Sequence, residues 1–179
     1  MVGGEEVKFA SPADAIASGI GMVHQHFKLI ESFTVAENIV LSQSKGGFLL
    51  KPEQIIADIE SLGEKYGLQV DPRAYVWQLG VGEKQRVEIL RMLYHRSRVL
   101  ILDEPTVGLD PKQILEIRDL IKELGKEHTV ILSSHILSEI SAVCDYVLIL
   151  SHGKLVASDT LENLTSLMQG QNSPVSYTH

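Results

Sequence analysis

Two stretches of this sequence, residues 99–102 and 129–132, are wholly apolar, and the segment between them has helical periodicity. Short apolar runs bounded by polar residues are typical of strands that are buried on both faces of a parallel sheet. Asp110 and Pro111 suit the start of the intervening helix, because aspartate accepts from free N–H groups there and proline needs no partner. The apolar side chains of this helix recur at Ile114, Ile117, Ile121 and Leu124. Such an alternation predicts an α/β fold with a parallel sheet.

The rest of the chain continues this alternation of strands and helices. Further strands are expected at 20–23, 146–150 and 155–157, and further helices at 34–41, 52–66, 82–95, 137–143 and after an N-cap at Asp159. The segment 42–50 is rich in Gly and Ser, which predicts a loop. Because residues 32–98 are mostly helical, we expect them to form a lobe inserted between strands of the sheet.

Composition and charge exclude several functional classes. The chain has 16 basic and 23 acidic side chains, a net charge of −7, which argues against a nucleic-acid binder that works through a basic surface. The single cysteine, Cys144, cannot form an internal disulfide, so we expect a reducing compartment and a thiol buried in the core. Since no apolar run approaches the roughly 20 residues of a membrane-spanning helix, we expect a soluble protein that reaches a membrane only through a partner.

Two adjacent carboxylates, Asp103 and Glu104, follow the apolar run 99–102. Open α/β sheets bind ligands at the carboxyl ends of their strands. In that position the first carboxylate can hold Mg²⁺, often through water, and the second can polarise an attacking water. A solvated acidic pair at a strand end is the alternative, and the pair alone does not decide between the two interpretations.

Four other motifs accompany this pair. They are Val23-His24-Gln25, the stretch from Leu79 to Arg86 that opens a helix, Gly108-Leu109-Asp110, and Ser134-His135 after a strand. In this order the sequence resembles the ATP-binding cassette (ABC) transporter ATPase family. The motifs are similar to the Q-loop, the signature motif, the D-loop and the switch histidine of that family, and the acidic pair is similar to its Walker B residues.

The resemblance implies that ATP and Mg²⁺ are the cofactors. Glu104 would be the general base, and His135 would contact the γ-phosphate. Asp103 would support the metal ion. Gln25 would reach the metal ion and the attacking water, and would couple the site to a membrane partner.

The signature motif would bind a nucleotide held by a second cassette. Its residues are Gly80, Val81, Gly82 and Glu83, and Asp110 of the D-loop would communicate across the same dimer. Glycines at a helix N-terminus let backbone N–H groups approach phosphate. The family usually has serine at the position of Gly80, so this chain lacks one hydroxyl donor to the γ-phosphate.

Other residues near these motifs have simpler interpretations. His24 and His26 flank Gln25 and could hold a metal ion, but neutral surface histidines are the favoured alternative. Trp77, just before the signature motif, is expected to pack rather than to stack on a ligand.

By the same resemblance, the fold is expected to be a truncated P-loop NTPase (RecA-like) parallel sheet core with an inserted ABC α-helical subdomain. Residues 1–31 would form the residual core with the Q-loop strand, and 32–98 the helical subdomain with the signature motif. Residues 99–169 would form the core with the Walker B pair, D-loop and switch histidine, and 170–179 a flexible tail.

The phosphate-binding loop of this family, G-x-x-x-x-G-K-[ST], is absent from the sequence. Gly-Lys occurs at 125–126 and at 153–154, but neither pair precedes Ser or Thr. In the core sheet that the resemblance implies, the strand before this loop lies between the strand that ends at the switch histidine and the next strand in sequence, so we expect strand 146–150 to lack one neighbour. It should pair with 154–157 in a hairpin and stay apart from 129–133, while strands 20–23, 99–102 and 129–133 should be adjacent and parallel.

The resemblance divides within the chain. Residues 9–98 resemble ATPases of nucleoside and simple-sugar importers, whereas residues 100–165 resemble exporter-type ABC ATPases. Integral-membrane permease subunits and a second cassette are the implied partners, with no nucleic acid, and the implied location is the cytoplasmic face of the membrane. The favoured function is therefore an ABC transporter ATPase subunit, here a fragment that is inactive alone. The alternatives are a non-hydrolysing interaction module and a soluble cassette protein that acts on DNA or translation.

Overall fold

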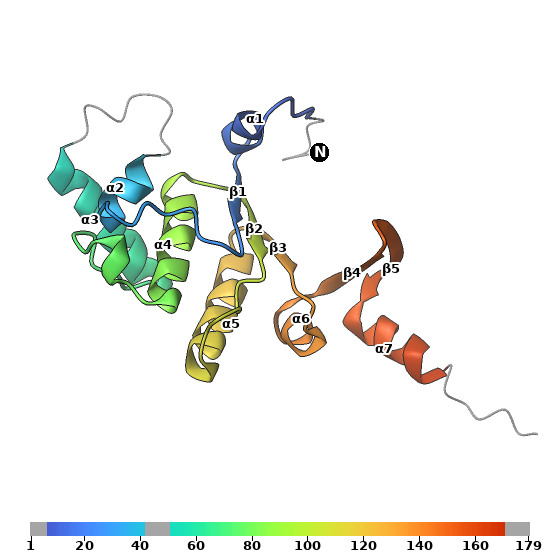
Figure 1. Cartoon of the computed structure of the whole chain (residues 1–179). Helices are drawn as coiled ribbons and strands as arrows, with labels where there is room; N and C mark the ends of the chain where they lie inside the picture. The colour runs from blue at the N-terminus through green and yellow to red at the C-terminus, as the bar shows by residue number, and fades with distance from the viewer. Residues whose placement is uncertain (1–6, 42–50, 171–179) are drawn as a thin grey trace, which may run out of the picture. The chain divides into compact units, whose positions relative to one another are not determined.

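The computed structural model describes residues 7–41 and 51–170, and the chain divides into two compact units, 1–135 and 136–179. The first unit contains α1 (Pro12–Ala17), β1 (Ile20–Val23), α2 (Val35–Val40), α3 (Pro52–Tyr66), the 3₁₀ turn η2 (Val76–Gln78), α4 (Val81–Tyr94), β2 (Val99–Asp103), α5 (Pro111–Gly125) and β3 (Thr129–Ser133). The second contains α6 (Leu137–Val143), β4 (Tyr146–Ser151), β5 (Lys154–Thr160) and α7 (Leu161–Gly170) (Figure 1). The units do not follow the boundaries that the motifs suggest, and those boundaries stay predictions.

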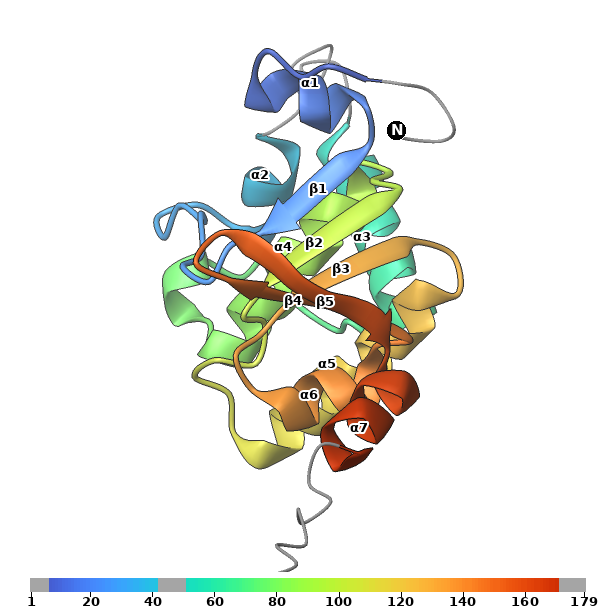
Figure 2. The ribbon, with the colours of Figure 1, turned by 90° about the vertical axis from the view of Figure 1, so that its right-hand side faces the viewer.

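The first unit is built on a parallel sheet in the order β1-β2-β3 (Figure 2). Val23 lies opposite Leu102, and Asp103 lies opposite Ser133. The predicted adjacency of these three strands is confirmed. Because the strands run in the same direction, their carboxyl ends meet at one edge of the sheet.

This sheet is covered on one face by α4 and α5 (Figure 1). Val23, Leu100 and Leu102 are fully buried, whereas Met22 on the other face is 39% exposed and Ile131 is 49% exposed. The expectation that the apolar strands are buried on both faces is therefore wrong for the described residues. The physical reason is that α4 and α5 pack against the same side of the sheet.

The helical part of the first unit comprises α2, α3 and α4, which contact one another. The capping box predicted for α2 is present, because the Glu37 N–H donates to Thr34 Oγ1 at 3.2 Å and the Thr34 N–H donates to Glu37 Oε2 at 2.7 Å. The hydrogen bonds from Thr34 lower the pKa of Glu37. Gly67 ends α3 with a φ of +67°, a left-handed conformation that favours glycine, as predicted.

The short helix α1 is not predicted by apolar periodicity. It is too short for a repeat, but its start carries a cap signal, because Ser11 Oγ accepts from the Asp14 N–H and Asp14 Oδ2 accepts from the Ser11 N–H. Pro12 occupies the first helical position. The N–H groups of Ala10 and Ser11 lower the pKa of Asp14.

The second unit contains the predicted hairpin. β4 and β5 are antiparallel, with Tyr146 opposite Thr160 and Ser151 opposite Lys154. In the described parts of the chain, β4 pairs with β5 alone and β3 pairs with β2 alone. Because β3 and β4 belong to different units, the expected separation of strand 146–150 from 129–133 stays a prediction.

Several local predictions in the second unit need correction. The N-cap of α7 is Thr160 rather than Asp159, because Thr160 Oγ1 accepts from the Asn163 N–H at 3.4 Å, while Asp159 accepts from the Asn163 side chain. Cys144 is only half-buried, and this burial raises the pKa of its thiol. Gly170 belongs to α7, and the predicted loop 42–50 and tail 171–179 lie outside the described residues. None of the described helices is both long and apolar enough to cross a bilayer.

Candidate functional site

The carboxyl edge of the parallel sheet carries the acidic pair that follows the apolar run. Asp103 is the last residue of β2, and Ser133, the last residue of β3, donates its hydroxyl to Asp103 Oδ1 at 2.5 Å. Ser133 is not among the residues that the motifs single out. The cluster Ser133-Ser134-His135 at a strand end is the signal that marks it. One carboxylate oxygen of Asp103 is thus held by the neighbouring strand.

Glu104 follows β2 and turns away from the strand direction. Its φ is +48°, in the left-handed region that non-glycine residues seldom adopt, and its N–H still donates to the Ser133 carbonyl at 3.1 Å. Glu104 Oε1 accepts from the His135 N–H at 3.1 Å and lies 2.9 Å from His135 Nδ1. Strained backbone of this kind is often found at functional sites. The structure therefore brings the predicted Walker B glutamate and switch histidine into direct contact.

The second carboxylate oxygen of Glu104 is in a different situation. Oε2 is buried and has no hydrogen-bond partner among the described residues. A buried polar atom without a partner is costly and is a common feature of sites that bind water or a ligand. Glu104 therefore combines one fixed oxygen with one that is available for chemistry.

Gln25 lies at the same edge of the sheet. It follows Val23 by two residues, and Val23 is the register partner of Leu102, which precedes the acidic pair. The side chains of His24, Gln25 and His26 are exposed. In residues 7–41 and 51–170, no group of three or more His, Cys, Asp or Glu side chains could hold a metal ion.

This set of residues fits Mg²⁺ better than zinc. Mg²⁺ usually takes one or two carboxylates and keeps several waters or phosphate oxygens, so it needs no cage of protein ligands. Asp103, with one oxygen engaged by Ser133, and the buried Oε2 of Glu104 are compatible with such a hydrated ion.

The predicted signature residues lie at the N-terminus of α4. Gly80 is the N-cap, Val81 is the first helical residue, and the Gly80 N–H donates to Glu83 Oε2 at 2.9 Å. The first N–H groups of a helix have no partner within the helix, and the helix dipole adds positive potential there. The local structure is therefore suited to an anion, as the resemblance implies.

The D-loop is packed against this helix N-terminus. A Cβ atom on Gly82 would lie 2.8 Å from Cδ of Gln113, and one on Gly108, whose φ is +79°, would lie 3.5 Å from Val81 Cγ1. Asp110 is the N-cap of α5, because its Oδ1 accepts from the N–H groups of Lys112 and Gln113, each at 2.9 Å. The Asp110 carboxylate thus has a structural role in this chain, and any contact across a dimer would be additional.

The predicted site residues therefore form two groups. Asp103, Glu104, His135 and Gln25 lie at the sheet edge, whereas Gly80, Val81, Gly82, Glu83 and Asp110 lie at the neighbouring N-termini of α4 and α5. Trp77, which was expected to pack, is instead 62% exposed beside the second group.

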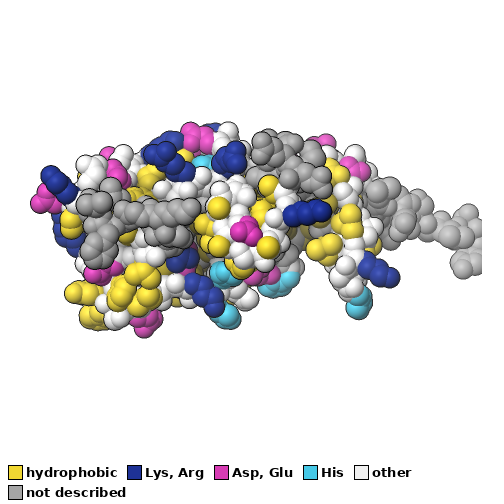
Figure 3. All heavy atoms as spheres, turned by 90° about the horizontal axis from the view of Figure 1, so that it is seen from above, with side chains coloured by type: hydrophobic (Ala, Val, Ile, Leu, Met, Phe, Trp, Pro, Cys, Tyr) yellow, Lys and Arg dark blue, Asp and Glu magenta, His cyan; other side chains and the backbone are white. Residues whose placement is uncertain are grey.

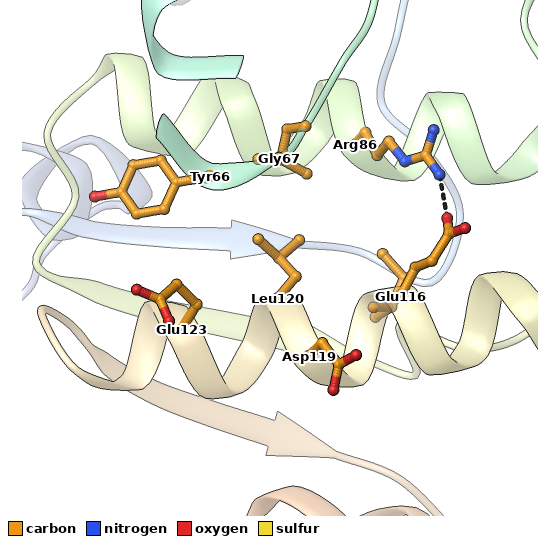
Figure 4. Close-up of a pocket in the computed structure, with 9 residues that line it drawn as sticks. Tyr66, Gly67, Arg86, Glu116, Asp119, Leu120 and Glu123 are labelled. Carbon is orange, nitrogen blue, oxygen red and sulfur yellow. Dashed lines mark hydrogen bonds and ion pairs between the residues drawn. The ribbon is translucent and has the colours of Figure 1, made fainter. Parts of the chain in front are cut away.

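A hollow between α3, α4 and α5 is lined by none of the residues of these two groups (Figure 4). Tyr66 and Gly67 line it from α3, Arg86 from α4, and Glu116 and Leu120 from α5. Arg86 Nη2 and Glu116 Oε2 form an ion pair at 2.5 Å across it. The residues that line it come from α3 and α4 of the helical part and from α5, which packs against the sheet.

Comparisons with known proteins agree with these motifs. Residues 2–107 match the family described as ABC transporter. The nucleoside import ATP-binding protein NupA of Lactococcus lactis subsp. cremoris is 42% identical over 169 residues, which cover 90% of this chain and 33% of NupA. The glucose import ATP-binding protein TsgD13 of Haloferax volcanii is 38% identical over 185 residues, which cover 87% of this chain and 34% of TsgD13.

A solved structure shows the same fold. CbiO1 from Clostridium perfringens, described as part of the ABC transporter complex CbiONQ, matches with a TM-score of 0.72 at 26% identity over 89% of this chain and 65% of that chain. The present chain spans about a third of the length of the two curated relatives. The fold class is thus an α/β parallel sheet of the P-loop NTPase type, and the chain belongs to the ABC transporter ATPase family.

Proposed function

We propose that this chain provides the catalytic edge and the signature helix of an ATPase subunit that drives import of nucleosides or simple sugars. The observation that carries the proposal is the contact of Glu104 with His135 at the ends of neighbouring strands. The names of NupA and TsgD13 support the substrate classes, because these proteins are described as nucleoside and glucose import proteins.

In this proposal Glu104 polarises the attacking water through Oε2. Its other oxygen is engaged by His135, and the buried Oε2, which has no hydrogen-bond partner among the described residues, can accept a hydrogen bond from a water molecule. Asp103, fixed by Ser133, and Gln25 would hold Mg²⁺, which neutralises phosphate charge when ATP is bound. The side chain of His135 is 73% exposed, so it can turn toward a phosphate with little loss of buried surface.

The signature residues would act on a nucleotide held by a second cassette. Gly80, Val81, Gly82 and Glu83 place backbone N–H groups at the start of a 14-residue helix, which favours an anion. No P-loop motif occurs in the 179 residues, so we expect them to hydrolyse no ATP by themselves.

The proposed membrane partner is a permease, which would hold the chain at the cytoplasmic face of the membrane. Hydrophobic side chains gather over the α2–α3 end of the molecule in Figure 3. Among the residues that flank α2 and α3 in sequence, Ile30 is 39%, Tyr75 is 46% and Trp77 is 62% exposed. The backbone N–H of Trp77 donates to the Glu31 carbonyl at 3.2 Å. Trp77 therefore lies beside the segment that follows the Q-loop in sequence. Exposed aromatic residues beside the segment that follows Gln25 suit a contact with a partner protein.

Photocrosslinking tests this placement. A photoreactive amino acid at position 77 should crosslink to a permease subunit in membranes that contain the assembled importer. The matched control is position 115 on α5, where Leu115 is also apolar and is 58% exposed. Permease adducts from position 115 but none from position 77 would contradict the proposal.

A non-hydrolysing interaction module is the second candidate, and the absence of a P-loop motif favours it. Calorimetric titration with Mg-ATP, followed by titration in the presence of a cassette that carries the P-loop, separates the two. The first proposal predicts ATP-dependent association with that cassette, weakened when Gly82 is replaced by Asp. The second predicts association that is independent of nucleotide.

A further inference from the structure

The backbone of Lys28, three residues after Gln25, is held by two side chains of the signature helix. The Lys28 N–H donates to Glu88 Oε1 at 2.7 Å, and Arg91 Nη1 donates to the Lys28 carbonyl at 3.4 Å. Arg91 Nη2 also forms an ion pair with Glu88 Oε2. The peptide groups of Lys28 are thus engaged on both sides by one ion pair, which we call the Lys28 clamp.

The burial of Glu88 indicates that its carboxylate has a specific role. Glu88 is 1% exposed and lies within a run of buried apolar residues, Val87 to Leu90. A carboxylate in that position is unfavourable unless it is paired and hydrogen-bonded, and an apolar side chain would pack there at less cost. The carboxylate of Glu88 is directed at one backbone N–H and one guanidinium. The carboxylate of Glu88 therefore serves to bind the backbone of Lys28, which an apolar core residue could not do.

The helix face that forms the clamp extends one turn further. Lys84, Glu88 and Arg91 follow one another at i, i+4 and i+7, so they share one face of α4. Lys84 Nζ lies 3.0 Å from Glu31 Oε1, which adds an exposed contact to the same segment. Glu31 is largely exposed in this pair, so we expect the pair to contribute little and the buried clamp to be the main contact between α4 and the chain after Gln25.

The other end of the segment is fixed to the sheet. Val23 belongs to β1 and pairs with Leu102 of β2. Gln25 therefore lies on a short connection between the catalytic edge and the signature helix, with one anchor on each.

We propose that Glu88 and Arg91 are positioning residues that link the segment 24–28, and with it Gln25, to the signature helix. A movement of Gln25 would then displace α4, because only three residues of chain separate Gln25 from the clamped residue Lys28. A flexible loop without this contact would absorb the movement. The inference rests on the proposed function only for the role of Gln25. The clamp itself can be tested in the chain without any nucleotide.

The first measurement is amide hydrogen exchange by NMR on the full 179-residue chain. Glu88→Met removes the acceptor but keeps the side-chain volume, and Lys84→Met introduces the same residue on the same helix face without touching the clamp. We expect the Lys28 amide to exchange about ten-fold faster or more in Glu88→Met, as expected for the loss of a hydrogen bond to a charged group. In Lys84→Met it should stay within about two-fold of the wild type.

The Ile30 amide is an internal reference. It donates to Asn38 Oδ1 at 2.7 Å, a contact that neither substitution alters. Its exchange rate should therefore be unchanged in both variants. A Lys28 amide that exchanges at the wild-type rate in folded Glu88→Met would overturn the clamp.

The second measurement reports on the link to Gln25. A nitroxide at His26→Cys, in a background where the single native cysteine is removed by Cys144→Ser, should give a narrower EPR line in Glu88→Met and an unchanged line in Lys84→Met. A faster Lys28 amide without any change at position 26 would show that the clamp does not reach Gln25, and the proposed link would fail.

A charge-reversed double variant, Glu88→Arg with Arg91→Glu, covers the case in which Glu88→Met does not fold. It keeps an ion pair on α4 but presents no acceptor to the Lys28 N–H. If the ion pair served only to stabilise the helix, the reversed pair would restore wild-type exchange at Lys28. The clamp predicts that exchange stays fast. Failure of ATP binding in separate experiments would affect the proposed function but none of these readouts.

Discussion

Glu104 and His135 are joined at two points, through the backbone N–H of His135 at 3.1 Å and its Nδ1 atom at 2.9 Å. Both contacts use the same carboxylate oxygen. The residues lie 31 positions apart in sequence and meet because β2 and β3 are parallel neighbours. The contact therefore fixes the turn after β3 to the turn after β2, and leaves the other oxygen of Glu104 for chemistry.

Variants of Glu104 should differ in stability according to whether they keep the oxygen that accepts from His135. Glu104→Gln keeps an oxygen that can accept from the His135 N–H, whereas Glu104→Ala removes it and leaves a cavity. We expect the alanine variant to be less stable than the glutamine variant by about 1–2 kcal/mol, as found when a hydrogen-bond partner is deleted. Urea denaturation of the two proteins checks this. Equal midpoints would show that the His135 contact contributes nothing to stability.

Steady-state phosphate release tests the absence of catalysis in the isolated chain. Without a P-loop motif, no backbone cradle holds the β- and γ-phosphates, so Glu104 has no positioned substrate. We expect release at the background rate with Mg-ATP. Turnover that disappears in Glu104→Gln would show that the chain is a complete enzyme.

His95 gives the helical part a dependence on pH. Burial is the main cause that lowers the pKa of His95, the nearby charge of Arg91 lowers it further, and a hydrogen bond to the Ile39 carbonyl opposes both. The folded protein therefore protonates His95 only at a lower pH than the unfolded chain, in which the imidazole takes up a proton as pH falls through about 6.5. The unfolded state then binds more protons, so stability decreases on acidification.

Thermal unfolding at pH 7.5 and at pH 5.5 measures this effect. His95→Gln, which keeps a donor for the Ile39 carbonyl but does not titrate, should show a smaller loss of Tm between the two pH values than the wild type. His24→Gln is the control, because His24 is exposed. Equal losses in wild type and His95→Gln would assign the pH dependence to other groups.

The helix starts, and the edge of the sheet that carries the site, follow from local rules that a single sequence contains, whereas the strand order was expected from the family resemblance. Thr34 with Glu37, and Asp110 with Pro111, mark helix starts because their side chains and rings satisfy free N–H groups only there. The carboxyl-end rule for parallel sheets places Gln25 and Glu104 at one edge without any knowledge of distances. These parts of the site could therefore be predicted.

Contacts between side chains and residues far away in the sequence could not be predicted in the same way. Nothing in the local pattern shows that Glu88 binds the backbone of Lys28, because its partner lies 60 residues earlier in the chain. The exposure of Trp77 and of Ile131 was also missed, since hydrophobicity alone indicates burial and does not reveal which face of an element is covered.

The hairpin β4–β5 should make the isolated chain prone to aggregate. Leu148, Leu150 and Val156 are 60%, 69% and 64% exposed, and in the described residues each strand of this two-stranded sheet pairs on one side only. Exposed apolar strands with unpaired edges are templates for association. The double substitution Leu150→Thr with Val156→Thr places β-branched side chains at both positions, which suit a strand, and removes apolar surface, so it should raise the concentration at which light scattering begins. Its free energy of unfolding should stay within about 0.5 kcal/mol of the wild type.

Val147→Thr is the matched control, because Val147 is only 8% exposed and its replacement should lower stability by about 1–3 kcal/mol without improving solubility. Unchanged scattering of the double variant would place the aggregating surface elsewhere, with the uncovered face of β1-β2-β3 around Met22 and Ile131 as the next segment to substitute.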